Sequence, residues 1–201
     1  MAPILREGAK NMAHTGGLAL ALPALLSYRC KSLVLGPNRA LEGSSQALSL
    51  IPGLLGRYIR QAFFSRVLAG CERTVVIEFG TIFSQTGARL DERAYIGPHC
   101  HLGLVHIESY AMLAAGVHVP SGAHTHRHAV VGEPIQLQPQ DRRLVRIGAG
   151  SWIGSGAVIM ADVGSNSIIG AGSVVTKPIP DGVVAAGVPA RVLRERETSG
   201  T

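Results

Sequence analysis

The sequence predicts an all-β solenoid, in which short parallel strands wind into stacked coils, with a helical appendage in front and a short helix behind. Ile-Gly pairs recur at spacings near six residues, at Ile147, Ile153 and Ile169. Gly is abundant, with 25 of 201 residues, and aromatic residues make up only 4%. A fixed short period of this kind indicates units that bury a continuous core only by stacking, and small residues suit the tight corners between strands.

We divide the chain into three parts. They are an N-terminal tail and helical appendage (1–72), a β-helix (73–180) with a protruding loop (121–143), and a C-terminal extended segment with a short helix (181–201).

The first part begins with a segment that has no clear pattern. Residues 1–15 are expected to form a poorly ordered tail, and residues 17–50 to form one or two short helices. The apolar run at residues 16–26 is too short to span a bilayer. The residues that follow it, 27–30, lack a small-x-small cleavage site. We therefore expect an uncleaved cytoplasmic segment.

A clearer helix is predicted over residues 54–69. Its apolar residues recur at three- and four-residue intervals, which places them on one face; they are Leu54, Leu55, Tyr58, Ile59, Ala62, Phe63 and Val67. Arg57, Arg60, Gln61 and Arg66 are expected mostly on the other side. Either this helix caps the open first coil, or its basic face makes a peripheral contact with an anionic membrane.

The ladder of short strands runs from about residue 75 to residue 177 and is interrupted once. Aliphatic residues stand six apart at Leu90, Ile96 and Leu102, and again from Ile107 after one five-residue step. The interruption, 121–143, carries three histidines and several Gln, Pro and charged residues. A loop this long inside a compact domain is usually functional.

The end of the ladder is marked by two prolines. Pro178 and Pro180 cannot donate to a strand ladder, so the strands should stop at 177–180. Residues 181–188 are expected to be extended. Pro189 then precedes a predicted short helix that ends near Glu197.

Charge and cysteine content exclude some classes. The formal net charge is +6, but the basic residues are dispersed and no Lys/Arg run alternates with aromatic residues, so nucleic-acid binding is not expected. Cys30, Cys71 and Cys100 are odd in number and lack CxxC spacing. We expect no disulfide framework or zinc knuckle, and a reducing cytoplasm.

Three motifs resemble the hexapeptide-repeat acyltransferases, specifically the galactoside and maltose O-acetyltransferase type and the polysaccharide O-acetyltransferases. They are SWIGS (Ser151–Ser155), IGAGSVVTKPIP (Ile169–Pro180) and VVAAGVPARVLRE (Val183–Glu195). The close match runs from Leu113 to Glu195. The resemblance implies a left-handed parallel β-helix, normally a homotrimer with active sites between subunits. It implies acetyl transfer from acetyl-CoA to a hydroxyl or amine, with no metal.

The resemblance also implies which residue is the general base. His124 follows the coil at the position where the similar enzymes place their catalytic histidine, and the histidine pKa suits proton removal near neutral pH. His126 and His128 are competitors, because alternate positions of an extended segment share a face. Solvated loop histidines without a catalytic role are the remaining alternative.

The donor-site residues implied by the resemblance lie in the last coils and the C-terminal segment. Lys177, Arg191 and Arg194 would meet the CoA phosphates through charge-assisted hydrogen bonds, although surface charge is the alternative for each. Backbone groups would hold the pantetheine arm. The full set is Ser155, Ala171, Thr176, Lys177, Arg191 and Arg194.

The sequence departs from the family before the loop, where His99, His101 and Glu108 stand in place of the usual acceptor-binding Asn and Asp. One later coil, between Ile159 and Ile169, is two residues short of three hexads. We expect a sugar or polysaccharide-precursor O-acetyltransferase that acts in the cytoplasm, either free or at the inner face of the membrane. Serine O-acetylation and amino-sugar N-acetylation are alternative reactions. Two further alternatives are a non-catalytic trimeric scaffold and a metal-dependent hydrase whose site would include His101 and His106.

Overall fold

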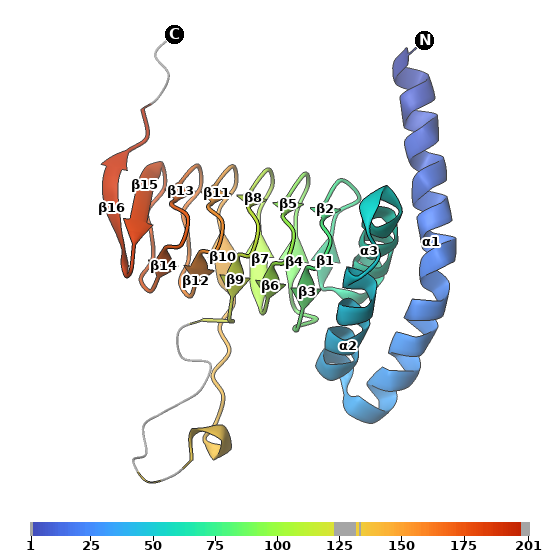
Figure 1. The fold of residues 1–201 in the computed structure, drawn as a ribbon, viewed down its shortest axis with the longest axis horizontal. Helices are drawn as coiled ribbons and strands as arrows, with labels where there is room; N and C mark the ends of the chain where they lie inside the picture. Colours follow the sequence, from blue (N-terminus) through green and yellow to red (C-terminus); the bar gives the residue numbers. More distant parts are fainter. Residues whose placement is uncertain (1, 123–131, 133, 198–201) are drawn as a thin grey trace.

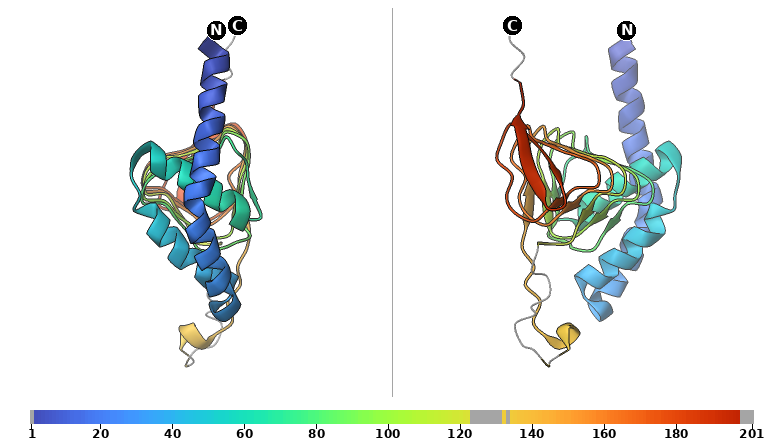
Figure 2. Two further views of the ribbon diagram at one scale, coloured as in Figure 1. Left: turned by 90° about the vertical axis from the view of Figure 1, so that its right-hand side faces the viewer. Right: turned by 60° about the vertical axis from the view of Figure 1, so that its left-hand side comes forward.

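The computed structural model describes residues 2–122, 132 and 134–197, with side chains from residue 15 onward. Three helices stand at one end, and short strands wind away from them in coils that end in a hairpin (Figure 1). The left view of Figure 2 looks along the stack with the first helix in front. The parallel β-helix predicted from the repeat is confirmed.

The strands form three sheets, one along each side of the solenoid. Sheet A contains β1 (Gly70–Cys71), β4 (Arg89–Leu90), β7 (Val105–Ile107) and β10 (Val145–Ile147). Sheet B contains β2 (Val76–Ile77), β5 (Tyr95–Ile96), β8 (Met112–Leu113), β11 (Trp152–Ile153), β13 (Ile168–Ile169), β15 (Val183–Gly187) and β16 (Ala190–Glu195). Sheet C contains β3 (Ile82–Phe83), β6 (His101–Leu102), β9 (His118–Val119), β12 (Val158–Ile159) and β14 (Val174–Val175).

Aliphatic side chains from the successive strands fill the interior. The predicted series Leu90, Ile96 and Leu102 is buried at 1%, 0% and 0% exposure. The sequence predicts one shortened coil, and the structure has two successive short steps, because Ile147 pairs with Val163 and Val163 with Ile179. Each of these steps is two residues shorter than three hexads.

In most coils, two of the three corners use a left-handed backbone position. Between sheets B and C, φ is positive in five successive coils, at Gly80, His99, Gly116, Gly156 and Gly172. Glycine occupies four of these positions because it lacks the Cβ that penalises this region. The corner spacing therefore explains much of the glycine periodicity in the sequence.

The N-terminal third differs from its prediction. It consists of α1 (Ala2–Leu35), α2 (Pro37–Ser49) and α3 (Gly53–Val67). The tail expected over residues 1–15 is wrong, because α1 is already helical at Ala2. The apolar run read as 16–26 continues through Thr15–Leu35, which has 21 residues and a mean hydropathy of 1.4. By length and composition alone, this stretch is sufficient to cross a membrane.

Helices α2 and α3 cap the open first coil. The rings of Phe63 and Phe64 lie 5.4 Å apart, and Phe64 packs on Phe83 of β3 at 4.7 Å. The hydroxyl of Ser45 accepts a hydrogen bond from the Phe83 N–H at 2.8 Å, and the Asn38 side chain accepts one from Thr86 N–H at 3.0 Å. These contacts cover an edge that would otherwise present unpaired N–H groups.

The basic outer face predicted for residues 54–69 is wrong for Arg60 and Gln61, although Arg66 is exposed as predicted. Arg60 is fully buried and Gln61 nearly so. The Arg60 guanidinium donates to the carbonyls of Ile77, Leu48 and Ile51, and so joins the end of α2 to the first coil. Arg57 is paired with Glu78. Burial lowers the pKa of Arg60, an effect that Glu78 partly opposes, and these positive charges serve the fold.

The short C-terminal helix predicted after Pro189 is also wrong. Ala190–Glu195 forms β16, which pairs antiparallel with β15. The turn between them includes Gly187, at φ 105°. The hairpin gives the last coil a partner for its exposed edge, a long-range requirement that outweighs local helix propensity.

Candidate active site

The outward side chains give each side of the solenoid a different chemistry. We call the outer surface of sheet A face A, with Arg89, His106 and Arg146 in register. Face B carries Tyr95, Met112, Trp152 and Ile168 in register on sheet B. Face C carries Ile82, His101, His118, Val158 and Val174 on sheet C. These differences indicate which face suits an active site and which suits a protein interface.

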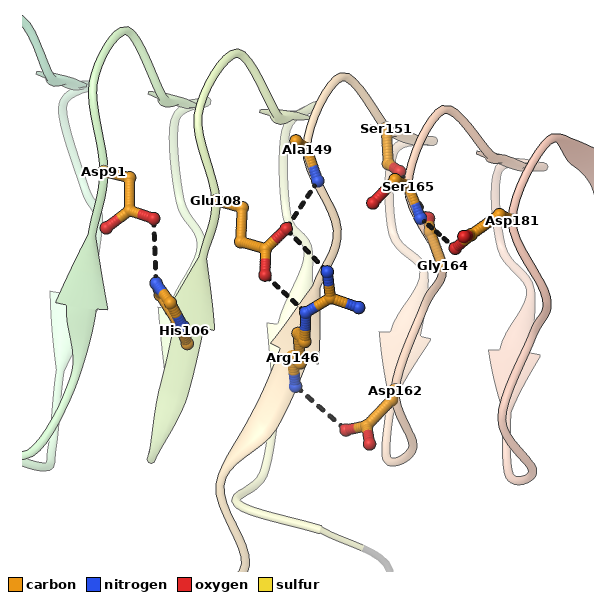
Figure 3. A network of polar contacts seen from close by, with 10 residues as sticks. All are labelled: Asp91, His106, Glu108, Arg146, Ala149, Ser151, Asp162, Gly164, Ser165 and Asp181. Atoms are coloured by element: carbon orange, nitrogen blue, oxygen red, sulfur yellow. Dashed lines mark hydrogen bonds and ion pairs between the residues drawn. The ribbon is translucent and has the colours of Figure 1, made fainter.

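Face A is tied together by ion pairs between coils (Figure 3). The carboxylate of Glu108 accepts hydrogen bonds from Arg146 Nη2 at 2.8 Å and from the Ala149 N–H at 3.0 Å. The carboxylate of Asp91 lies 2.9 Å from His106 Nε2. Partial burial raises the pKa of Glu108, but these hydrogen bonds outweigh it, and the net shift is downward. Glu108 therefore links the coils before and after the loop, and it does not lie on the same face as His101.

Face B is apolar and open. Met112 and Trp152 occupy equivalent positions on neighbouring strands and are 43% and 46% exposed. Ile168 continues the row at the next strand. Such a row of exposed large apolar side chains on a regular sheet is typical of a protein interface.

Face C carries a pair of stacked histidines. The rings of His101 and His118 lie 5.2 Å apart and are inclined by only 7°. Burial lowers the pKa of His118, and the neighbouring His101 lowers it further, which favours the neutral imidazole. We did not predict this pair, although the two residues stand at equivalent places in consecutive coils.

The long loop leaves the solenoid at the end of face C. It follows β9 directly, and its neck is closed by the Arg143 N–H, which donates to the Ser121 carbonyl at 2.8 Å. The Ser121 hydroxyl also accepts from the Leu104 N–H at 2.7 Å. The described ends of the predicted loop, 121–122 and 134–143, leave and rejoin the solenoid between two coils (Figure 1). His124, His126 and His128 lie outside the described residues, and the assignment of the base stays a prediction.

Four of the predicted donor residues lie along the two borders of face C. Ser155 and Ala171 occupy the same corner of consecutive coils, where the Gly172 N–H donates to the Ser155 carbonyl at 2.8 Å. Thr176 and Lys177 follow β14 at the opposite border, the one from which the loop departs. All four are exposed. The fold thus brings these four donor candidates and the point where the loop leaves the solenoid to one side of the molecule.

The two arginines lie farther along, on the terminal hairpin. Arg191 and Arg194 belong to β16 on sheet B and are exposed. Arg194 pairs in register with Val184. The guanidinium of Arg191 donates to the backbone carbonyl of Ala190, and that of Arg194 donates to the backbone carbonyl of Glu195. Both arginines therefore lie on a strand at the end of the solenoid and not on the predicted helix.

The geometry separates the histidines that a metal-dependent hydrase would need. His101 lies on face C, whereas His106 lies on face A beside Asp91. Within the described part of the chain, no three His, Cys, Asp or Glu side chains gather into a group suited to a metal. The described residues therefore do not assemble the metal site of that alternative.

Comparisons with known proteins agree with this geometry. The profile of the family described as "Bacterial transferase hexapeptide (six repeats)" matches residues 145–177. The chain is 62% identical over 53 residues to a galactoside O-acetyltransferase of Escherichia coli K12, covering 25% of this chain and 26% of that protein. It is 41% identical over 73 residues to a galactoside O-acetyltransferase of Lactococcus lactis, covering 35% of each chain.

A solved structure extends the likeness over most of the chain. Galactoside acetyltransferase in complex with coenzyme A aligns with a TM-score of 0.66 at 26% identity, over 82% of this chain and 84% of that chain. The alignments with the two curated relatives cover only about a quarter to a third of their length. The predicted resemblance to hexapeptide-repeat transferases of the galactoside type is confirmed.

Proposed function

We propose that the chain transfers an acetyl group from acetyl-CoA to a hydroxyl of a sugar or polysaccharide precursor. The observation that carries this proposal is the position of four donor candidates on the two borders of face C, with Thr176 and Lys177 on the border from which the loop departs. The likeness to a galactoside acetyltransferase solved with coenzyme A supports both donor and acceptor class.

The proposed reaction is a direct transfer in a ternary complex. His124 removes the proton of the acceptor hydroxyl as its oxygen attacks the thioester carbonyl carbon. The tetrahedral intermediate then collapses, the C–S bond breaks, and the proton held by His124 passes to the departing CoA thiolate. The products are the acetyl ester and free CoA, so no covalent enzyme intermediate is needed.

The proposed donor site divides its work between backbone and charge. Backbone groups of Ser155 and Ala171 would hold the pantetheine arm at the corner that they share. Lys177, Arg191 and Arg194 would contact the phosphates, because cations form strong charge-assisted hydrogen bonds with phosphate oxygens. The exposure of all three supports this assignment.

We also propose a homotrimer that acts in the cytoplasm, with each active site between two subunits. Faces B and C are largely apolar, whereas face A is filled with ion pairs. A prism with two apolar sides and one ionic side is suited to a closed cyclic assembly in which face A stays in water. The cysteines Cys30, Cys71 and Cys100 are all free, as a reducing compartment requires.

The test is a thiol-release assay with acetyl-CoA and a panel of sugars, nucleotide-sugars, an amino sugar and serine. We expect turnover with a sugar hydroxyl. His124→Ala should lower kcat by about 10²–10⁴-fold and leave CoA affinity nearly unchanged. Lys177→Ala should mainly weaken CoA binding.

His126→Ala and His128→Ala are the matched controls for the base. Near-normal turnover of His124→Ala would exclude that residue, and a large loss in one control would move the role to it. Turnover with serine or with the amine alone would replace the proposed acceptor class.

A further inference from the structure

The outer side of helix α1 is an apolar surface that nothing in the described chain covers. Between residues 15 and 35 it exposes a row of large hydrophobic side chains, and the most exposed are Leu33 (88%), Val34 (83%) and Leu26 (62%). Leu20 and Leu22 add to the row at 55% and 51%. Only 6% of the apolar window is buried. Exposed apolar surface of this extent marks an interaction site.

The inner side of α1 is already occupied, and this restricts how a partner can approach. Gly17 is so close to Tyr58 of α3 that an added Cβ would lie 2.9 Å from the Tyr58 carbonyl oxygen. Ala21 is fully buried, and the Tyr28 ring meets Phe63 edge to face at 5.9 Å. A helix packed along one side cannot be surrounded by lipid. The helix can therefore lie in a membrane surface while this packing persists, but it cannot cross the bilayer.

The positions of the charges favour a lipid surface. At about 100° of rotation per residue, Arg29 and Lys31 stand at the two opposite borders of the outer apolar arc. Basic side chains at such borders reach the headgroups while their stems cover apolar surface. The net charge of +6 has the sign that attracts an anionic leaflet.

The place of α1 in the fold makes the approach unobstructed. The helix forms the outermost layer at one end of the molecule, and the coils extend away behind it (Figures 1 and 2). A flat surface can thus contact the outer side of α1 without meeting the solenoid or the terminal hairpin. Within residues 54–69, Arg60 and Gln61 are buried, so of the predicted basic face only Arg57 and Arg66 remain accessible to a membrane.

We propose that the outer face of α1, residues 15–35, docks in the plane of an anionic lipid membrane, with its leucines in the acyl boundary. The docking surface lies at the opposite end of the solenoid from the terminal hairpin with Arg191 and Arg194. Docking through α1 would orient the solenoid so that it extends away from the membrane surface. This inference does not depend on acetyl transfer, so either proposal can fail alone.

The test is flotation of the purified full-length protein with vesicles of phosphatidylcholine, alone or mixed with phosphatidylglycerol. The wild-type protein should float with both and bind the anionic vesicles more tightly. Leu22→Glu and Leu26→Glu should each lower the partition coefficient by about tenfold or more, since each removes buried apolar area and adds a negative charge. Arg29→Gln should reduce the preference for anionic vesicles by about fivefold.

Leu193→Glu is the matched control, because Leu193 is 65% exposed on β16 at the far end of the molecule. It should bind vesicles as the wild type does, and circular dichroism should show the same helix content in every variant. Failure of the wild-type protein to float would overturn the proposal. So would a smaller particle mass for Leu26→Glu without vesicles, which would make the face an interface between copies. Loss of the segment from the cellular protein, seen by intact mass, would identify a cleaved signal.

Discussion

At the residue scale, glycine serves two separate purposes in the coils. Some glycines accept a positive φ, as Gly156 does at 68°. Others make room for the neighbouring coil, as Gly148 does, where an added Cβ would lie 2.4 Å from the backbone nitrogen of Ser165. The sequence alone shows the same letter at both kinds of position, so only the structure separates them.

This distinction predicts the effect of Gly148→Ala. The new methyl group would press on the backbone of the next coil, which cannot move aside as a flexible side chain would, so unfolding should become easier by about 1–3 kcal/mol. Gly43→Ala is the control, because Gly43 lies in α2 with nothing within 4 Å of the added Cβ. There alanine should stabilise the helix by about 0.5–1 kcal/mol. Denaturant melts measure both, and equal changes would contradict the backbone contact.

At the element scale, the Glu108–Arg146 pair closes the solenoid across the base of the loop. It joins β7 to β10, which are neighbours in the sheet although the whole loop separates them in sequence. The adjacent pair Arg143–Asp162, at 2.9 Å, lies on the same side of the neck. The long insertion is therefore tolerated because the strands on either side of it stay in register.

The pair also predicts a pH dependence. The pKa of Glu108 is lowered in the folded protein, so its stabilising effect is present above the unfolded pKa of about 4.3 and is lost as pH falls through the folded pKa. Glu108→Gln should cost about 1 kcal/mol at pH 7, since one partner is partly exposed, and the difference from wild type should shrink in acid. Thermal melts from pH 7 to pH 3 measure it.

Glu92→Gln is the control for this measurement. Glu92 lies 3.4 Å from Arg93, with both side chains more than half exposed, so its removal should change the melting temperature little at any pH. A constant gap between Glu108→Gln and wild type across the same range would show that the carboxylate charge is not what stabilises the neck.

The elements divide clearly into those that the sequence predicts and those that it does not. The strands repeat one local rule, and Leu90, Ile96 and Leu102 are buried as their spacing indicates. Short helices were expected within residues 17–50, but the full length of α1 was missed because it packs through small residues, such as Gly17 and Ala21, that carry no amphipathic signal. The terminal hairpin was missed because β16 forms against an edge that exists only after the coils have stacked.

The candidate site divides in the same way. The family resemblance implied Ser155 and Ala171 as candidates, and the fold places them at the same corner of consecutive coils because both follow the repeat. The stacked His101 and His118 could have been found by aligning consecutive coils. The burial of Arg60 could not be predicted from the sequence. An arginine on a helix is normally expected to be solvated, and only the capped first coil supplies the carbonyl groups that accept its hydrogen bonds.

At the scale of the whole molecule, the three faces lead to a prediction about assembly. Trp152 stands in the middle of the row on face B, between Met112 and Ile168. A large aromatic residue at the centre of an apolar patch is where interface energy concentrates, often 2 kcal/mol or more per contact. In the proposed trimer Trp152→Glu would bury an unpaired charge in each contact, so the assembly should dissociate, and turnover should fall if the sites lie between subunits.

Light scattering of the wild type should give the mass of a trimer, and Trp152→Glu should give a smaller mass at the same concentration. Arg89→Glu is the matched control, because Arg89 is exposed on face A and should leave the mass unchanged. Unchanged mass and turnover for Trp152→Glu would show that face B is not an interface. Dissociation caused by Arg89→Glu would instead place the subunit contact on face A. It would contradict the proposal that faces B and C form the subunit contacts and contain the active site.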